Sequence, residues 1–110
     1  MIKFSENLYT TKSTASAVNR IKLKLISGIG ILHLYLITLS ANGDDLFDII
    51  PAAQFKVRKF RRMNHVIVGV ADSKRAAFKM TEQMILDCEA KTGSFDNMRA
   101  YFEDFFLRGK

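Results

Sequence analysis

The stretch from Ile31 to Leu39 constrains the fold more than any other part of the chain. In an extended strand, alternate side chains point to opposite faces. Here both alternating sets are apolar: Ile31, Tyr35, Ile37 and Leu39 form one set, and Leu32, Leu34 and Leu36 form the other. Because a strand that is apolar on both faces is covered on both faces, the pattern predicts a central strand of a sheet.

Two further strands follow from local signals. Asn42-Gly43 is a hairpin turn sequence, so Leu46 to Ile50 is expected to return as an antiparallel partner that ends at Pro51. The β-branched run from His65 to Ala71 predicts another strand, in which Gly69 marks a close backbone approach. His65 is expected at the solvent end of this strand, and His33 in the core or at an interface.

Helical spacing predicts three helices. The first begins at Ser13 and ends at Gly28, although Ile21 to Leu25 also fits an alternating strand. The second is long, capped by Asp72 or Ser73 and ended by Gly93. Its apolar stripe consists of Ala77, Met80, Met84 and Cys88, widened by Phe78, Ile85 and Leu86. A last helix is capped by Asp96, and its apolar face consists of Met98, Tyr101, Phe102, Phe105 and Phe106.

The remaining segments are less regular. Residues 1–12 are interpreted as a loose lead-in or an edge strand, and residues 52–64 as a short helix that runs into a loop. The expected order is therefore α-β-β-(α)-β-α-α. It predicts an α+β fold: a small, mainly antiparallel sheet of three or four strands with helices packed on it. At 110 residues, the chain is expected to form a single domain, 1–110.

Composition narrows the functional class. The single Cys88 excludes an internal disulfide and is typical of a reducing compartment. Residues 25–41 carry no charge but are too short and polar for a membrane span, and their apolar run begins too far into the chain for a signal peptide. A cytoplasmic protein without a membrane partner is expected.

We find no persuasive catalytic or metal-binding set. His33, His65 and Cys88 lack a ligand cluster at metal spacing, and the carboxylates form no convergent pair. Gly28 and Gly30 precede a strand rather than follow one, so they do not form a nucleotide-binding loop. The sequence therefore favours a protein that is not an enzyme, with no catalytic residue, cofactor or metal.

The most prominent chemical feature is a basic run. Lys56, Arg58, Lys59, Arg61 and Arg62 lie close together with no acid between Asp48 and Asp72, in a chain of net charge +6. Such a cluster attracts phosphates, and Phe55 and Phe60 would stack on bases if they were exposed. The alternative is that both aromatic side chains enter the core while the bases form a solvated surface.

The chain also resembles small uncharacterised bacterial proteins of about this length. The resemblance lies in His65-Val-Ile-Val-Gly-Val-Ala71, the long helix after it, Lys91-Thr-Gly93 and Met98-Arg-Ala-Tyr101. The earlier segments Asn19-Arg-Ile-Lys-Leu-Lys24 and Asp48-Ile-Ile-Pro51 fit the same pattern. The resemblance implies an intracellular bacterial origin and supplies no activity and no site residues.

Two functions follow from the sequence. The first is a non-enzymatic interaction or assembly domain that self-associates as a homodimer. Its interface would be the apolar face of the last helix, made of Met98, Tyr101, Phe102, Phe105 and Phe106. The alternative is a nucleic-acid-binding module that uses the basic run of residues 55–62.

Overall fold

The computed structural model describes residues 2–29, 33–40, 46–94 and 97–108. Its four strands are β1 (Ile2–Thr10), β2 (Tyr35–Leu39), β3 (Phe47–Pro51) and β4 (His65–Ala71). The helices are α1 (Lys12–Ala15), α2 (Val18–Ser27), the 3-10 helix η1 (Ala52–Lys56), α3 (Arg58–Arg61), α4 (Lys74–Thr92) and α5 (Met98–Arg108). The α+β class is confirmed, whereas the predicted order is wrong because a strand precedes the first helix.

The sheet is mixed, with the strand order β1-β4-β2-β3. β2 pairs antiparallel with both β3 and β4, and β1 pairs parallel with β4. β2 is central as predicted, and Leu36 and Ile37 are both fully buried, one on each face. The antiparallel pairing of β2 with β3 is confirmed, while the predicted turn at Asn42-Gly43 lies outside the described residues. His33 is exposed ahead of β2, so its predicted core position is wrong.

β1 decides between the two alternatives for residues 1–12: residues 2–10 form an edge strand rather than a loose lead-in. The strand pairs with β4 in two parts, and the register shifts between Phe4 and Tyr9. In the irregular stretch, Ser5 Oγ donates to the Phe106 carbonyl at 2.9 Å and Asn7 Nδ2 donates to the Phe105 carbonyl at 2.6 Å. Because the last carbonyls of a helix lack partners within it, these two side chains cap α5 while the strand bends.

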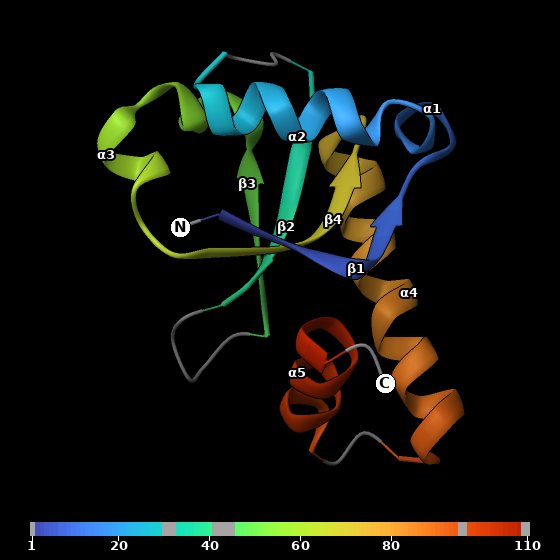
Figure 1. The fold of residues 1–110 in the computed structure, drawn as a ribbon. Coiled ribbons are helices and arrows are strands. Elements are labelled where there is room, and N and C mark those ends of the chain that lie inside the picture. Colours follow the sequence, from blue (N-terminus) through green and yellow to red (C-terminus); the bar gives the residue numbers. More distant parts are fainter. Residues whose placement is uncertain (1, 30–32, 41–45, 95–96, 109–110) are drawn as a thin grey trace.

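Helices cover both faces of the sheet (Figure 1). One layer consists of α2, η1 and α3, and we call it the α2–α3 layer. It packs Ile21, Leu25 and Phe55 against Leu36 and Ile67 of the sheet. α4 covers the opposite face, and α5 packs beside it against the lower end of the sheet. The two helical layers therefore lie on opposite faces of the sheet, and each packs on its own core cluster.

The α4 layer follows the predicted pattern closely. Ser73 Oγ accepts a hydrogen bond from the Ala76 N–H, and Gly93 ends the helix at φ 77°. The predicted stripe of Ala77, Met80, Met84 and Cys88 is buried. Phe78 and Leu86 do not widen it, because both are more than half exposed. Opposite the stripe, a Cβ on Gly69 would lie 2.8 Å from Met80 Sδ, which confirms the close approach predicted for this glycine.

Candidate anion-binding site

The basic run divides between a pocket and the surface around it. Arg58, Arg61 and Arg62 line a pocket of about 370 Å³ together with Ile2 and Ile26, and we call this the arginine pocket. Arg58 and Arg62 are exposed, and Arg61 is half-buried. Lys56 and Lys59 are exposed outside the pocket lining. Three of the five predicted cations are therefore brought together by the fold.

Three distant segments build the arginine pocket. The N-terminal end of β1 supplies Ile2, and the last turns of α2 supply Ile26. The chain reaches α3 after η1, so that α3 and the N-terminal end of β1 lie on the same side of the molecule (Figure 1). Val57, extended at φ −79° and ψ 116°, separates η1 from α3. Lys56 therefore belongs to η1, whereas Arg58, Lys59 and Arg61 belong to α3.

Arg61 is held in place by the backbone around it. Its Nη1 donates to the Phe55 carbonyl at 2.9 Å and to the Lys56 carbonyl at 3.1 Å. The guanidinium also packs against Gly28, where a Cβ would collide with it. Gly28 ends α2 at φ 77°, a conformation that favours glycine. The charge of Arg61 is therefore fixed before any ligand arrives, which lowers the conformational entropy lost on binding.

An aromatic cluster supports the pocket from the core side. The ring centroid of Phe55 lies 5.2 Å from that of Phe60 and 4.9 Å from that of His65. Phe55 is only 1% exposed and Phe60 is half-buried, so neither is presented for base stacking. His65 is buried, which corrects its predicted solvent position, and its Nε2 lies 2.7 Å from the Phe60 carbonyl. Because a carbonyl only accepts hydrogen bonds, Nε2 carries the proton.

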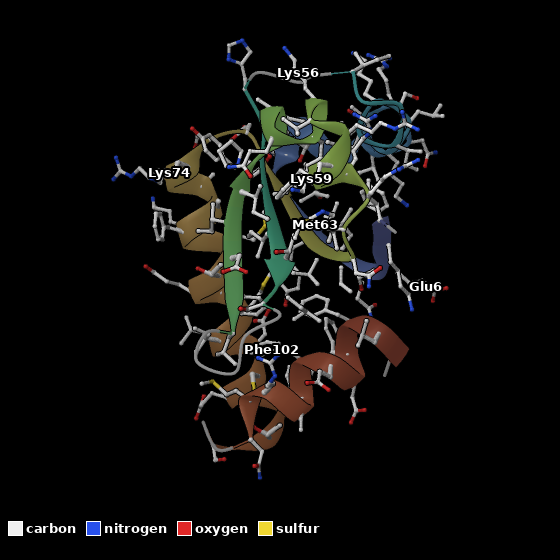
Figure 2. All side chains as sticks on the ribbon, turned by 90° about the vertical axis from the view of Figure 1, so that its left-hand side faces the viewer. Glu6, Lys56, Lys59, Met63, Lys74 and Phe102 are labelled. Carbon is white, nitrogen blue, oxygen red and sulfur yellow. The ribbon has the colours of Figure 1, made fainter. Side chains whose placement is uncertain are left out.

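Charge is strongly segregated between the two helical layers. Residues 11–29 and 52–64, which hold α1, α2, η1 and α3, contain nine Lys and Arg and no Asp or Glu. In α4 and α5, six Lys and Arg are offset by five Asp and Glu. Figure 2 shows Lys59 and Met63 on one side of the strands and Lys74 on the other. The helices around the arginine pocket therefore carry Lys and Arg without Asp or Glu, and such a concentration of positive charge attracts anions.

Of the five residues predicted as a self-association interface, two are buried within this chain and three are half-buried. Phe102 and Phe106 are 2% and 3% exposed, and Phe47 packs edge-on against both of their rings. Met98, Tyr101 and Phe105 are half-buried against the same core. The apolar face of α5 is thus used to close the lower end of the sheet. Self-association stays a prediction.

A second polar cluster links β1 to α4. Tyr9 Oη donates to Asp87 Oδ2 at 2.5 Å, and Gln83 Nε2 donates to Asp87 Oδ1 at 2.8 Å. Burial, reinforced by the Asp87 carboxylate, raises the pKa of Tyr9 above its usual value. Burial also raises the pKa of Tyr101, with smaller contributions from Cys88 and Asp87. Both phenols therefore stay protonated at neutral pH, and the Tyr9–Asp87 bond joins the edge strand to the helix.

Other reactive groups are not assembled into a site among the described residues. Cys88 is fully buried on the inner stripe of α4. Within the ranges that the structure describes, no three His, Cys, Asp or Glu side chains lie close enough to hold a metal ion. In the same ranges, no helix has the length and apolar character needed to cross a membrane.

Sequence reasoning missed three parts of the site. Ile2 and Ile26 line the arginine pocket, and Gly28 accommodates the guanidinium of Arg61. Gly28 was expected to end the first helix, and that role is confirmed, but its contact with Arg61 depends on how α2 and α3 pack. No local pattern relates Ile2 to the basic run.

Comparisons with protein-family models, curated proteins and solved structures found no match to this chain. The resemblance to small bacterial proteins therefore stays a prediction.

Proposed function

We propose that this protein is a non-enzymatic module that binds nucleic acid through phosphate contacts at the arginine pocket. The observation that carries this proposal is the pocket lining itself: among the described residues it consists of three arginines and two isoleucines, with no carboxylate. Guanidinium groups match phosphate oxygens in geometry and charge, and Arg61 is already fixed toward α2.

A polymer fits this surface better than a single small anion. The Nζ of Lys22 lies 5.3 Å from the ring centroid of Phe4, two residues along β1 from the Ile2 that lines the pocket. Lys56 at the end of η1 and Lys59 of α3 are exposed and extend the positive surface. Exposed lysines therefore lie outside the pocket as well as arginines inside it, so the positive surface is larger than one phosphate group. The described side chains include no base-reading motif, so recognition should be tolerant of sequence.

The proposal predicts weak binding that depends steeply on salt. With three phosphates neutralised, the logarithm of the association constant should fall with the logarithm of salt concentration at a slope of about −2 to −3. Replacing Arg58, Arg61 and Arg62 together with Gln should remove most of this slope and the affinity at ~50 mM salt. Fluorescence anisotropy with labelled oligonucleotides measures both quantities.

A matched control removes the same charge from the other layer. Lys74, Arg75 and Lys79 are exposed on α4, and replacing all three with Gln changes the net charge equally. This variant should keep nearly all of the salt slope. The proposal is wrong if the wild-type protein binds no oligonucleotide at ~50 mM salt, or if both triple variants lose affinity equally.

Two glycines test the fixed position of Arg61. Gly28 and Gly93 both end helices at φ 77°, so replacing either with Ala introduces the same backbone strain of about 1–2 kcal/mol. A Cβ at Gly28 meets the guanidinium of Arg61, whereas a Cβ at Gly93 meets nothing within 4 Å. Gly28→Ala should therefore weaken oligonucleotide binding severalfold, and Gly93→Ala should leave it unchanged. Equal affinities for the two variants would show that the position of Arg61 does not matter.

A further inference from the structure

The surface around the arginine pocket carries large aliphatic side chains as well as positive charge. Among the described residues, eight large hydrophobic side chains are exposed, and five belong to the α2–α3 layer and its adjoining residues. These five are between 55% and 67% exposed, and they are Leu23, Ile26, Ile29, Val57 and Met63. Scattered exposed leucines are ordinary on a protein surface, but a concentration of this kind marks a binding surface.

The aliphatic side chains are interleaved with the cations. Ile26 lines the arginine pocket directly, and Leu23 lies one helical turn before it on α2. Val57 and Met63 flank α3 and the pocket arginines at either end. A ligand whose phosphate contacts the pocket arginines therefore has Ile26 in the same pocket, and Val57 and Met63 are exposed at the two ends of α3.

We infer that the arginine pocket takes single-stranded rather than double-stranded nucleic acid; this inference rests on the proposed function. A duplex presents phosphates at its surface and keeps its base faces stacked inside, so it offers no base face to these side chains. A single strand exposes base faces beside its phosphates, and proteins bind such strands by combining a positive groove with aromatic rings or guanidinium planes on which the bases stack. In this chain aliphatic side chains take the place of the aromatic rings, because Phe55 is buried and Phe60 packs half-buried against the same core cluster. The guanidinium planes of exposed Arg58 and Arg62 provide additional stacking surfaces.

The test compares a 12-nucleotide RNA of mixed sequence with the duplex of the same sequence at equal salt. The wild-type protein should bind the single strand at least tenfold more tightly than the duplex. The double variant Leu23→Ser and Met63→Ser should reduce this preference to within about twofold while leaving the salt slope unchanged, because neither side chain lines the arginine pocket and the arginines remain. Leu86→Ser is the matched control, since Leu86 is 55% exposed on α4, and it should keep the full preference.

The outcomes separate this inference from the proposed function. Equal affinity for single strand and duplex, together with an unchanged double variant, overturns the inference and leaves phosphate binding intact. Absence of binding to either oligonucleotide overturns both. Binding to phosphatidylglycerol vesicles without binding to either oligonucleotide also overturns both, because the cations and aliphatic side chains would then serve an anionic lipid surface.

Discussion

Phe102→Ala should lower the free energy of unfolding by about 3–5 kcal/mol, the usual cost of removing a buried phenylalanine. Phe102 is 2% exposed and lies where α5 meets the sheet, with its ring centroid 4.8 Å from that of Phe47. Its position at the foot of the sheet is visible in Figure 2. Thermal unfolding measures the effect, and the melting temperature should fall by more than about 10 °C.

Two comparison variants place this loss on a scale. Phe105 is only half-buried, so Phe105→Ala should cost clearly less than Phe102→Ala. Leu86 is exposed on α4, and Leu86→Ala should change stability by less than about 0.5 kcal/mol. If Phe102→Ala melted at the same temperature as Leu86→Ala, the packing of α5 described above would be wrong.

Phe55→Ala should have an effect of similar size, about 3–5 kcal/mol, on the opposite face of the sheet. Phe55 is 1% exposed and packs against Phe60 and His65. Its carbonyl also accepts a hydrogen bond from Arg61 at 2.9 Å, so the cavity should disturb the arginine pocket as well as the core. Urea denaturation measures the stability, and anisotropy under conditions in which the variant remains folded measures the affinity.

The two readouts distinguish a core role from a role in the pocket. Phe55→Leu keeps most of the apolar volume, so it should lose less stability and keep most of the affinity. Phe102→Ala lies in the other core cluster and should lose stability without losing affinity in the folded state. Full retention of oligonucleotide affinity by folded Phe55→Ala would show that the core does not position Arg61.

The fold was predictable wherever its signals lie within one segment. The β4–α4 unit has a β-branched run from His65 to Ala71, a capping Ser73 and a terminal Gly93, and all three act as predicted. The sequence did not distinguish an edge strand from a loose lead-in at β1, because Ser5, Glu6 and Asn7 interrupt the apolar alternation. Ser5 and Asn7 cap α5, about a hundred positions away in the sequence. A pattern of neighbouring residues cannot predict such a long-range contact.

The candidate site shows the same division. The basic run could be identified from the sequence, because the number of charged residues in a segment does not depend on how the chain folds. The pocket itself depends on Ile2 and Ile26, which only the packing of β1 and α2 brings to Arg61. The orientation of Phe55 also depends on tertiary packing, since the period of residues 52–64 fits neither a regular helix nor a strand. The buried position of Phe55 removes its stacking on bases from the prediction, whereas the predicted phosphate contacts remain a proposal.

An NMR titration of the ¹⁵N-labelled protein with a short single-stranded oligonucleotide at ~50 mM salt tests directly whether the arginine pocket binds nucleic acid. If it does, shift changes concentrate on the backbone of Gly28 and on the Nε–Hε groups of Arg58, Arg61 and Arg62. Helix α4, on the opposite face of the sheet, should show little change. Shift changes centred on α4 or α5, with the three arginines and Gly28 unmoved, would contradict binding at this pocket.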